Sequence, residues 1–364
     1  MEHKRKKTET LDSLYRSQKS EVGSQMSDVF CPLSSVFCLE VLLFAYLTIF
    51  IFGCDESLQP ATGDFYVSKN KTPWSKALRI TQESLVDSNP LVRMHAIEVV
   101  ASTGQLRFMP TVHRLLRDKS IPVRFASALA IGDLKYSPAK STVAQLLEDT
   151  DSNVVIAAAY AMSKLGSAEY FEAVRKALGD NDQKLRANAA LLLGKSGDAS
   201  SLKLLWQTMQ DKDSDDRVVY QSAEAIAMLG DERIYPKLWT MLISAYHDVR
   251  TMGVIAMGKL GTPDANNALI RMLDDDILEV RLEAAKQLGV FRDPIGEAVV
   301  LDVFEKNLIS GLDKQAAERA NVLTALAIGQ IRTPTLRRFL PQLLQNESKL
   351  VRIAAAKAVF LCTK

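Results

Sequence analysis

The side chains that could carry chemistry in this chain are four histidines, four cysteines and a few acidic runs. No two of His3, His95, His113 and His247 stand at the spacing by which a helix offers two ligands to one metal ion. We therefore expect each histidine at a surface or helix-cap position, and we expect neither a metal nor a cofactor. The acidic run Asp274–Asp276 lies between two amphipathic segments, where it is typical of helix caps rather than of a catalytic pair of carboxylates.

Short catalytic motifs point the same way. The letters GKS at Gly194–Ser196 match part of a phosphate-binding loop, but the first glycine of that motif would fall at Ala189. Patterns typical of serine hydrolases, zinc proteases and haem attachment do not occur in the sequence. We expect no catalytic residues, and therefore a protein that is not an enzyme.

Composition limits the class of partner. The 364 residues are 47% hydrophobic and 24% charged, with a formal net charge of +2. A nucleic-acid-binding protein usually shows a clear basic excess, so we expect no nucleic acid as partner. No pair of the four cysteines has metal-ligand spacing, and nothing resembles a disulfide framework.

The N-terminal segment has features of an export signal. A basic cluster at Lys4–Lys7 precedes a run of uncharged, mostly apolar residues from Val41 to Phe52, which is short for a membrane span. The letters IFGC that end at Cys54 resemble a bacterial lipobox, which implies cleavage before Cys54 and lipidation of it. An uncleaved signal anchor and a buried apolar helix are the alternatives. The first two place the chain at a bacterial cell membrane, facing outside the cytoplasm.

We divide the chain accordingly. Residues 1–54 form a signal or anchor segment, and residues 55–72, which carry Pro, Gly and Ser without periodicity, form a linker. Residues 73–364 contain a repeat. A ten-residue block such as VRLEAAKQLG recurs nine times, at steps of 31, 31, 31, 33, 31, 31, 40 and 31 residues, which is the pattern of a solenoid. The blocks begin at Val92, Val123, Val154, Leu185, Val218, Val249, Val280, Ala320 and Val351.

Each repeat predicts two helices. Counting the first block residue as position zero, apolar residues at zero, four, seven, eight and eleven make one helical stripe, flanked by small residues at five and nine where a neighbouring helix must come close. Capping residues precede the block and glycines follow it; they are Asn89, Ser120, Asp151, Asp182, Asp215, Ser348 and Gly104, Gly166, Gly197, Gly230, Gly261. A second amphipathic segment lies upstream. The fold class is therefore an all-α solenoid of about nine two-helix repeats.

This pattern resembles the HEAT-repeat family, in its short bacterial form related to phycobilisome-lyase repeats. The resemblance implies a ladder in which a recurring Arg and Asp link adjacent repeats. The Asp residues are Asp87, Asp118, Asp149, Asp180, Asp213 and Asp275. Val155, Val219 and Asn321 replace the Arg, and Ser244 and Gln315 replace the Asp, so we expect the ladder to be interrupted there.

Two irregularities remain open. The 40-residue step holds about nine extra residues, which predict either a loop or a lengthened first helix, and either a surface insertion or a binding loop. The sequence ends within the second helix of the last repeat. Its final face is therefore covered by another copy of the chain, or small residues suffice there.

The concave face, lined by the second helix of each repeat, is where the resemblance places a partner. Positions three, six and ten lie opposite the core stripe. Leu129, Tyr160 and Leu191 would form an apolar row there, with lysines alongside; the alternative is that tight curvature shields these side chains. The candidate partner-binding residues are Leu129, Tyr160, Lys164, Leu191, Lys195, Glu224, Ile255 and Lys259. If the row is open, Tyr160→Asp weakens partner capture without unfolding the chain.

The function we infer from the sequence is a membrane-tethered scaffold for protein–protein interaction that uses this concave face. The identity of the protein partner stays open. A bilin-lyase-like enzyme or enzyme subunit is the alternative that the family resemblance implies.

Overall fold

The structure is a computed structural model that describes residues 72–363, all of whose regular elements are helices. The anchor, lipidation at Cys54 and linker predicted for residues 1–72 fall outside this range, except for Thr72. The first described helix, α3, begins at Pro73 with Thr72 as its N-cap. Among the described helices none has the length and apolar character that crossing a bilayer requires.

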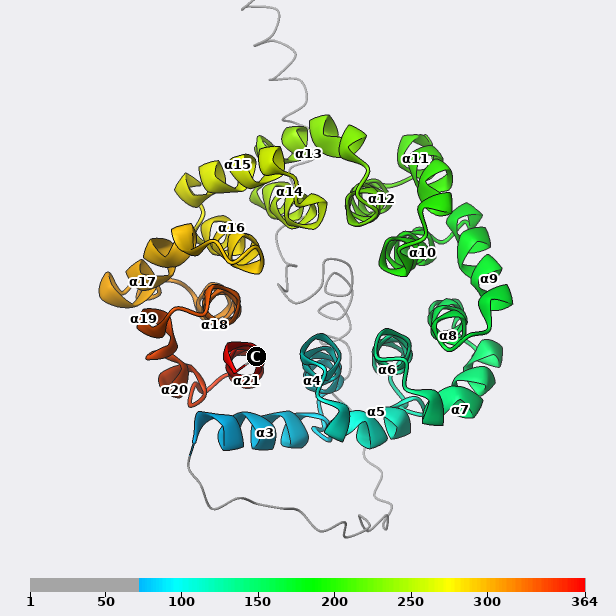
Figure 1. Ribbon diagram of the computed structural model, residues 1–364, viewed down its shortest axis with the longest axis horizontal. Coiled ribbons are helices and arrows are strands. Elements are labelled where there is room, and N and C mark those ends of the chain that lie inside the picture. Colours follow the sequence, from blue (N-terminus) through cyan, green and yellow to red (C-terminus); the bar gives the residue numbers. More distant parts are fainter. Residues whose placement is uncertain (1–71, 364) are drawn as a thin grey trace, which may run out of the picture.

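Nine pairs of helices follow one another along the described chain, as the nine blocks predict (Figure 1). The second helix of each pair lines the inside of the assembly. These inner helices are α4 (Pro90–Thr103), α6 (Ile121–Asp133), α8 (Ser152–Lys164), α10 (Gln183–Ser196), α12 (Asp216–Met228), α14 (His247–Leu260), α16 (Leu278–Val290), α18 (Lys314–Ile331) and α21 (Lys349–Cys362).

The first helix of each pair forms the outer wall, often with a short 3-10 turn at one or both ends. The outer helices are α3 (Pro73–Ser84), α5 (Met109–Leu115), α7 (Lys140–Gln145), α9 (Phe171–Lys176), α11 (Leu202–Gln210), α13 (Tyr235–Leu242), α15 (Pro263–Arg271), α17 (Glu297–Glu305) and the pair α19 (Pro334–Arg337) and α20 (Leu340–Leu343).

Local sequence signals begin and end these helices. All six predicted capping residues occupy N-cap positions, and the side chains of five accept a backbone amide; Ser120 is the exception. The five predicted glycines all adopt positive φ, the left-handed conformation that stops a helix with little strain. The two-helix unit is therefore encoded repeat by repeat.

The stack closes on itself, which the sequence did not predict (Figure 1). Helix α21 packs against α3 and α4, so the last repeat contacts the first. Phe360 meets the edge of Trp74 with ring centroids 5.0 Å apart, and one hydrophobic cluster contains both Ala77 and Phe360. The final face is thus covered neither by another copy nor by small residues alone. The first repeat of the same chain covers it, and we call this junction the seam.

Two ion pairs lie across the seam. Lys349 Nζ donates to Asp87 Oδ2 at 2.6 Å, and Lys357 Nζ donates to Glu98 Oε1 at 3.3 Å. Burial alone would raise the pKa of Asp87, but hydrogen bonds from Lys349 and from the Asn89 amide outweigh that effect and hold it below its usual value. Within the described residues Asp87 is the first aspartate of the ladder, and Lys349 of the last repeat pairs with it in place of an arginine.

Small residues at position nine let inner helices approach, as predicted. A Cβ placed on Gly194 would lie 2.8 Å from Ala225 Cα, and one on Gly329 would lie 2.7 Å from Ala358 Cα. Real Cβ atoms do not come so close to backbone, so these contacts need glycine.

The Arg–Asp ladder is present where the sequence predicts it, with one change of residue. Three arginines each donate two hydrogen bonds, at 2.7–2.9 Å, to the carboxylate 25 residues ahead; they are Arg93, Arg124 and Arg250. The partner of Arg186 is Asp211 and not the expected Asp213, because the two extra residues of the 33-residue step follow Asp211. Arg281 contacts the carbonyls of its own turn, Asp275 and Asp276, so the rung that Gln315 would have completed is missing.

The 40-residue step lengthens the second helix of its repeat, not the first. Helix α18 begins six residues before its block, at Lys314, whereas the other inner helices begin two residues before theirs. The remaining extra residues lie in the turn between Glu305 and Lys314. Following this added turn, Arg319 lies on the inside of the ring, and Glu318 accepts a hydrogen bond from the N-cap hydroxyl of Ser348.

Candidate functional site: the ring cavity

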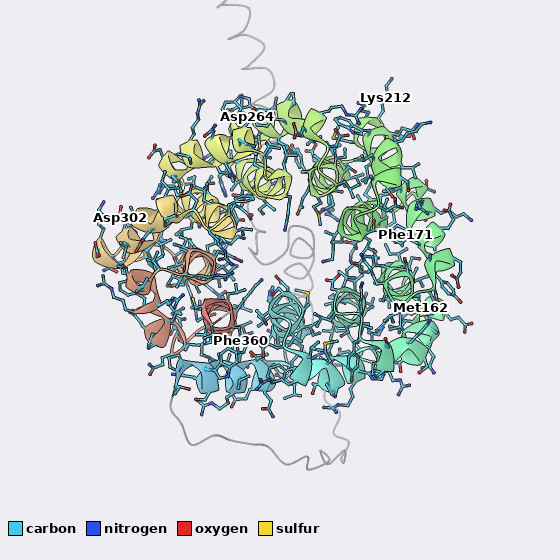
Figure 2. All side chains as sticks on the ribbon, viewed as in Figure 1. Met162, Phe171, Lys212, Asp264, Asp302 and Phe360 are labelled. Carbon is cyan, nitrogen blue, oxygen red and sulfur yellow. The ribbon has the colours of Figure 1, made fainter. Side chains whose placement is uncertain are left out.

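The inner helices enclose a cavity of about 420 Å³ at the centre of the ring. Closure therefore corrects one sequence-based expectation: the concave face is the wall of this cavity and not an open groove. The helical period explains which side chains reach it, since positions six and ten share the face opposite the core stripe. Eight of the nine position-six residues line it: Glu98, Leu129, Leu191, Glu224, Ile255, Lys286, Leu326 and Lys357. Figure 2 shows the inner side chains converging on this space.

Six of the eight candidate residues lie on the cavity wall, and two do not. Leu129, Leu191, Lys195, Glu224, Ile255 and Lys259 line it. Tyr160 is only 1% exposed, because its ring packs under Gly132 of α6 and its hydroxyl donates to Asp133 Oδ1 at 2.7 Å. The predicted apolar row is therefore interrupted at Tyr160. Lys164 donates to the carbonyl of Ser196 at the end of α10, at 3.0 Å, and lies outside the lining.

Most charged groups of the wall are paired. Lys195 Nζ lies 2.9 Å from Asp133 Oδ2, and Lys357 contacts Glu98. Burial would raise the pKa of Glu98, but Lys357 and His95 together hold it below its usual value. The first pair joins α10 to α6 past the intervening α8, and the second joins α21 to α4 across the seam, so both pairs stabilise the wall as well as neutralise it.

Helix α16 adds a buried polar cluster behind the wall. Glu283 is fully buried, with Oε2 2.7 Å from Lys286 Nζ and Oε1 accepting from Gln287 Nε2 at 2.6 Å. Both oxygens of this carboxylate are therefore engaged by side chains of its own helix.

Lys259 is the exception among the lysines and arginines of the lining. Its ammonium forms no hydrogen bond or ion pair with the part of the chain that the structure describes, and it is exposed to the cavity. Desolvation by the surrounding ring lowers its pKa; Glu224 opposes this effect, while Lys286 and Lys195 reinforce it. The side chain is open to water inside the cavity but sits within protein on most sides.

A second ionic cluster lies at the level where the inner helices begin. His247 Nδ1 is 3.0 Å from Asp248 Oδ1, and Arg319 Nη2 is 3.8 Å from Glu279 Oε1. Desolvation raises the pKa of Asp248 despite His247 and Arg319. Sequence reasoning missed this level, although Asp248, Glu279 and Arg319 stand seven positions before position six, two helical turns away on the same face.

The histidines differ in part from expectation. His247 is at the start of α14, and His113 Nε2 lies 2.8 Å from Thr142 Oγ1, between two outer helices. His95 is buried on α4 beside Glu98, at 3.8 Å, so the surface or cap position expected for it is wrong. Among residues 72–363, no three His, Cys, Asp or Glu side chains gather as a metal ion would require.

Comparisons with known proteins place the repeat. No curated protein is significantly similar in sequence. The solved structures that are similar include human deoxyhypusine hydroxylase with glycerol (18% identity, covering 72% of this chain and 99% of that one, TM-score 0.35). They also include the complex of CpcE and CpcF of phycocyanin lyase from Nostoc (17%, 83% and 100%, TM-score 0.29). Kap95p with RanGDP is similar as well (13%, 80% and 45%, TM-score 0.34). Likeness at this level carries no argument about function.

The family model for HEAT repeats matches residues 77–162, 109–181 and 171–253. The same two-helix unit, with its caps and ladder, continues in the structure through α21. Residues 77–253 of this chain are therefore HEAT repeats.

Proposed function

We propose that this protein is a scaffold that binds a protein partner, and that part of the partner enters the ring cavity. The observation that carries the proposal is the convergence on one cavity of Leu129, Leu191 and Ile255 with Lys259, which has no ion-pair partner among residues 72–363. A wall built only for stability would pair its charges and bury its aliphatic side chains. HEAT-repeat stacks also provide long surfaces without a preformed catalytic cleft, which favours binding over catalysis.

A matched pair of leucine variants tests this proposal. Leu191→Asn changes the cavity wall, and Leu204→Asn makes the same change on the exposed side of outer helix α11. Both proteins and the unchanged chain are used as bait in solubilised membranes, and captured proteins are quantified by mass spectrometry. A partner of the cavity is lost with Leu191→Asn and kept with Leu204→Asn. If both variants capture the same proteins in equal amounts, the partner does not bind at the cavity.

We propose further that the ring is tethered to a bacterial membrane through its N-terminal segment. The support is the basic cluster, the apolar run from Val41 to Phe52 and the IFGC letters before Asp55. Cys54→Ser is expected to abolish incorporation of an alkyne-labelled fatty acid and to release the protein from the membrane fraction. Cys38→Ser is the matched control and should leave both unchanged. Labelling that survives Cys54→Ser contradicts lipidation at this cysteine.

A further inference from the structure

The cavity wall is polarised along the ring axis. Position ten lies in the last turn of each inner helix, and the seven of its nine residues that line the cavity include two lysines and one acidic residue. The nine are Ser102, Asp133, Lys164, Lys195, Met228, Lys259, Val290, Gln330 and Leu361. Lysines near helix C-termini are favoured by the helix dipole, which explains part of the excess. Asp133 is shared by Lys195 and Tyr160. An excess of positive charge therefore remains at this level.

The positive charge of Lys259 is the part of this excess that forms no hydrogen bond or ion pair within the described chain. Lys195 is engaged by Asp133 and Lys164 by the Ser196 carbonyl. Two acids lie within electrostatic range of Lys259, and one of them, Glu283, already has both oxygens engaged. The other, Glu224, accepts from Gln221 Nε2 at 3.1 Å. The ammonium of Lys259 thus has hydrogen-bond donors directed to a cavity that can hold an acceptor.

Aliphatic side chains line the cavity one turn away. Position six precedes position ten by four residues, or about 6 Å along the helix. Leu129, Leu191, Ile255 and Leu326 stand at that level on four different helices. A cavity of about 420 Å³ is within the usual range for a compact ligand. An aliphatic group with a carboxylate at one end matches this arrangement of apolar wall and cation.

We propose that the cavity binds the C-terminal tail of the protein partner, with its terminal carboxylate at Lys259 and its last aliphatic side chains against the position-six leucines and isoleucine. A chain end supplies a carboxylate and neighbouring aliphatic side chains in one segment, whereas an internal loop has no main-chain carboxylate to offer Lys259. Capture of a terminal carboxylate is a known mode of peptide recognition. This inference rests on the proposed function and names the chemistry of its partner.

Two labelled hexapeptides test it on the full chain. Both carry fluorescein followed by Gly-Ser-Gly-Leu-Val-Leu, and they differ only in ending as a free carboxylate or as an amide. Binding is measured by fluorescence anisotropy. A charge-assisted hydrogen bond predicts that the free acid binds roughly tenfold more tightly than the amide. Lys259→Met should remove that preference, while Lys212→Met, which deletes an outward-facing lysine of the outer wall (Figure 2), should keep it.

Each other outcome overturns the inference. Equal binding of acid and amide would show that no carboxylate is recognised, and a preference that survives Lys259→Met would place it elsewhere. A peptide tail would also be excluded if neither peptide bound. It would equally be excluded if dodecanoate displaced a fluorescent apolar probe from the cavity and neither peptide displaced it. None of these results touches the scaffold proposal, because that rests on whether Leu191→Asn loses a captured protein.

Discussion

At the scale of single residues, Tyr160 determines how α8 joins α6. Its ring is buried against Gly132 and its hydroxyl is held by Asp133, whose charge, together with burial, raises the tyrosine pKa. Tyr160→Asp removes a buried aromatic ring and places a carboxylate at a buried position, so we expect a loss of about 4 kcal/mol in the free energy of unfolding. Tyr160→Phe keeps the ring and should lose about 1 kcal/mol. Urea denaturation measures both.

This result would reverse the sequence-based expectation that Tyr160→Asp spares the fold. If the free energy of unfolding of Tyr160→Asp lies within about 1 kcal/mol of that of the unchanged chain, the ring of Tyr160 is not part of the core.

Glycine at position nine is a second residue-scale constraint. A Cβ on Gly194 would lie 2.8 Å from the backbone of α12, whereas one on Gly179 would meet nothing within 4 Å. Gly194→Ala should therefore cost about 2 kcal/mol, because overpacking against backbone exceeds the gain in helix propensity. Gly179→Ala is the control and should not destabilise. Equal midpoints of thermal unfolding for the two variants would contradict the close approach of α10 and α12.

At the scale of elements, the missing rung between α8 and α10 can be restored. Val155 stands at the ladder position of α8, and Asp180, 25 residues ahead, already accepts the Asp182 amide at 2.8 Å. Val155→Arg should form the absent pair and raise the free energy of unfolding by up to about 1 kcal/mol, since Asp180 is exposed. A double-mutant cycle with Asp180→Asn measures the pair itself. A coupling energy near zero would mean that the repeats do not present these positions to each other.

The elements could be predicted from the sequence because every signal is local. Caps such as Asp151, stop glycines such as Gly166 and the apolar stripe act within one repeat. The choice between Leu129, which lines the cavity, and Tyr160, which does not, depends on how far apart two neighbouring helices stand. Position six alone could not distinguish them, and neither could it show that the cavity wall includes Arg319, which stands two helical turns before position six.

At the scale of the whole molecule, closure depends on a quantity that no single repeat contains. The rotation between successive repeats must add up to one full turn over nine of them, and small errors would leave an open superhelix. The sequence showed the period but not that rotation. The complementary ends became visible only in the structure, where Trp74 meets Phe360 and Asp87 meets Lys349.

Closure predicts coupling between the two ends of the chain. In an open stack the terminal repeats fray independently, whereas a ring ties α3 and α4 to α21. Phe360→Asp buries a charge at the seam, so amide hydrogen exchange should accelerate in α21 and equally in α3, more than 250 residues away in sequence. Phe171→Asp, which disturbs α9 on another part of the ring (Figure 2), should leave α3 protected. If Phe360→Asp leaves the rate of amide hydrogen exchange in α3 unchanged, the ring is open in solution. The concave face would then be a groove with room for a larger partner.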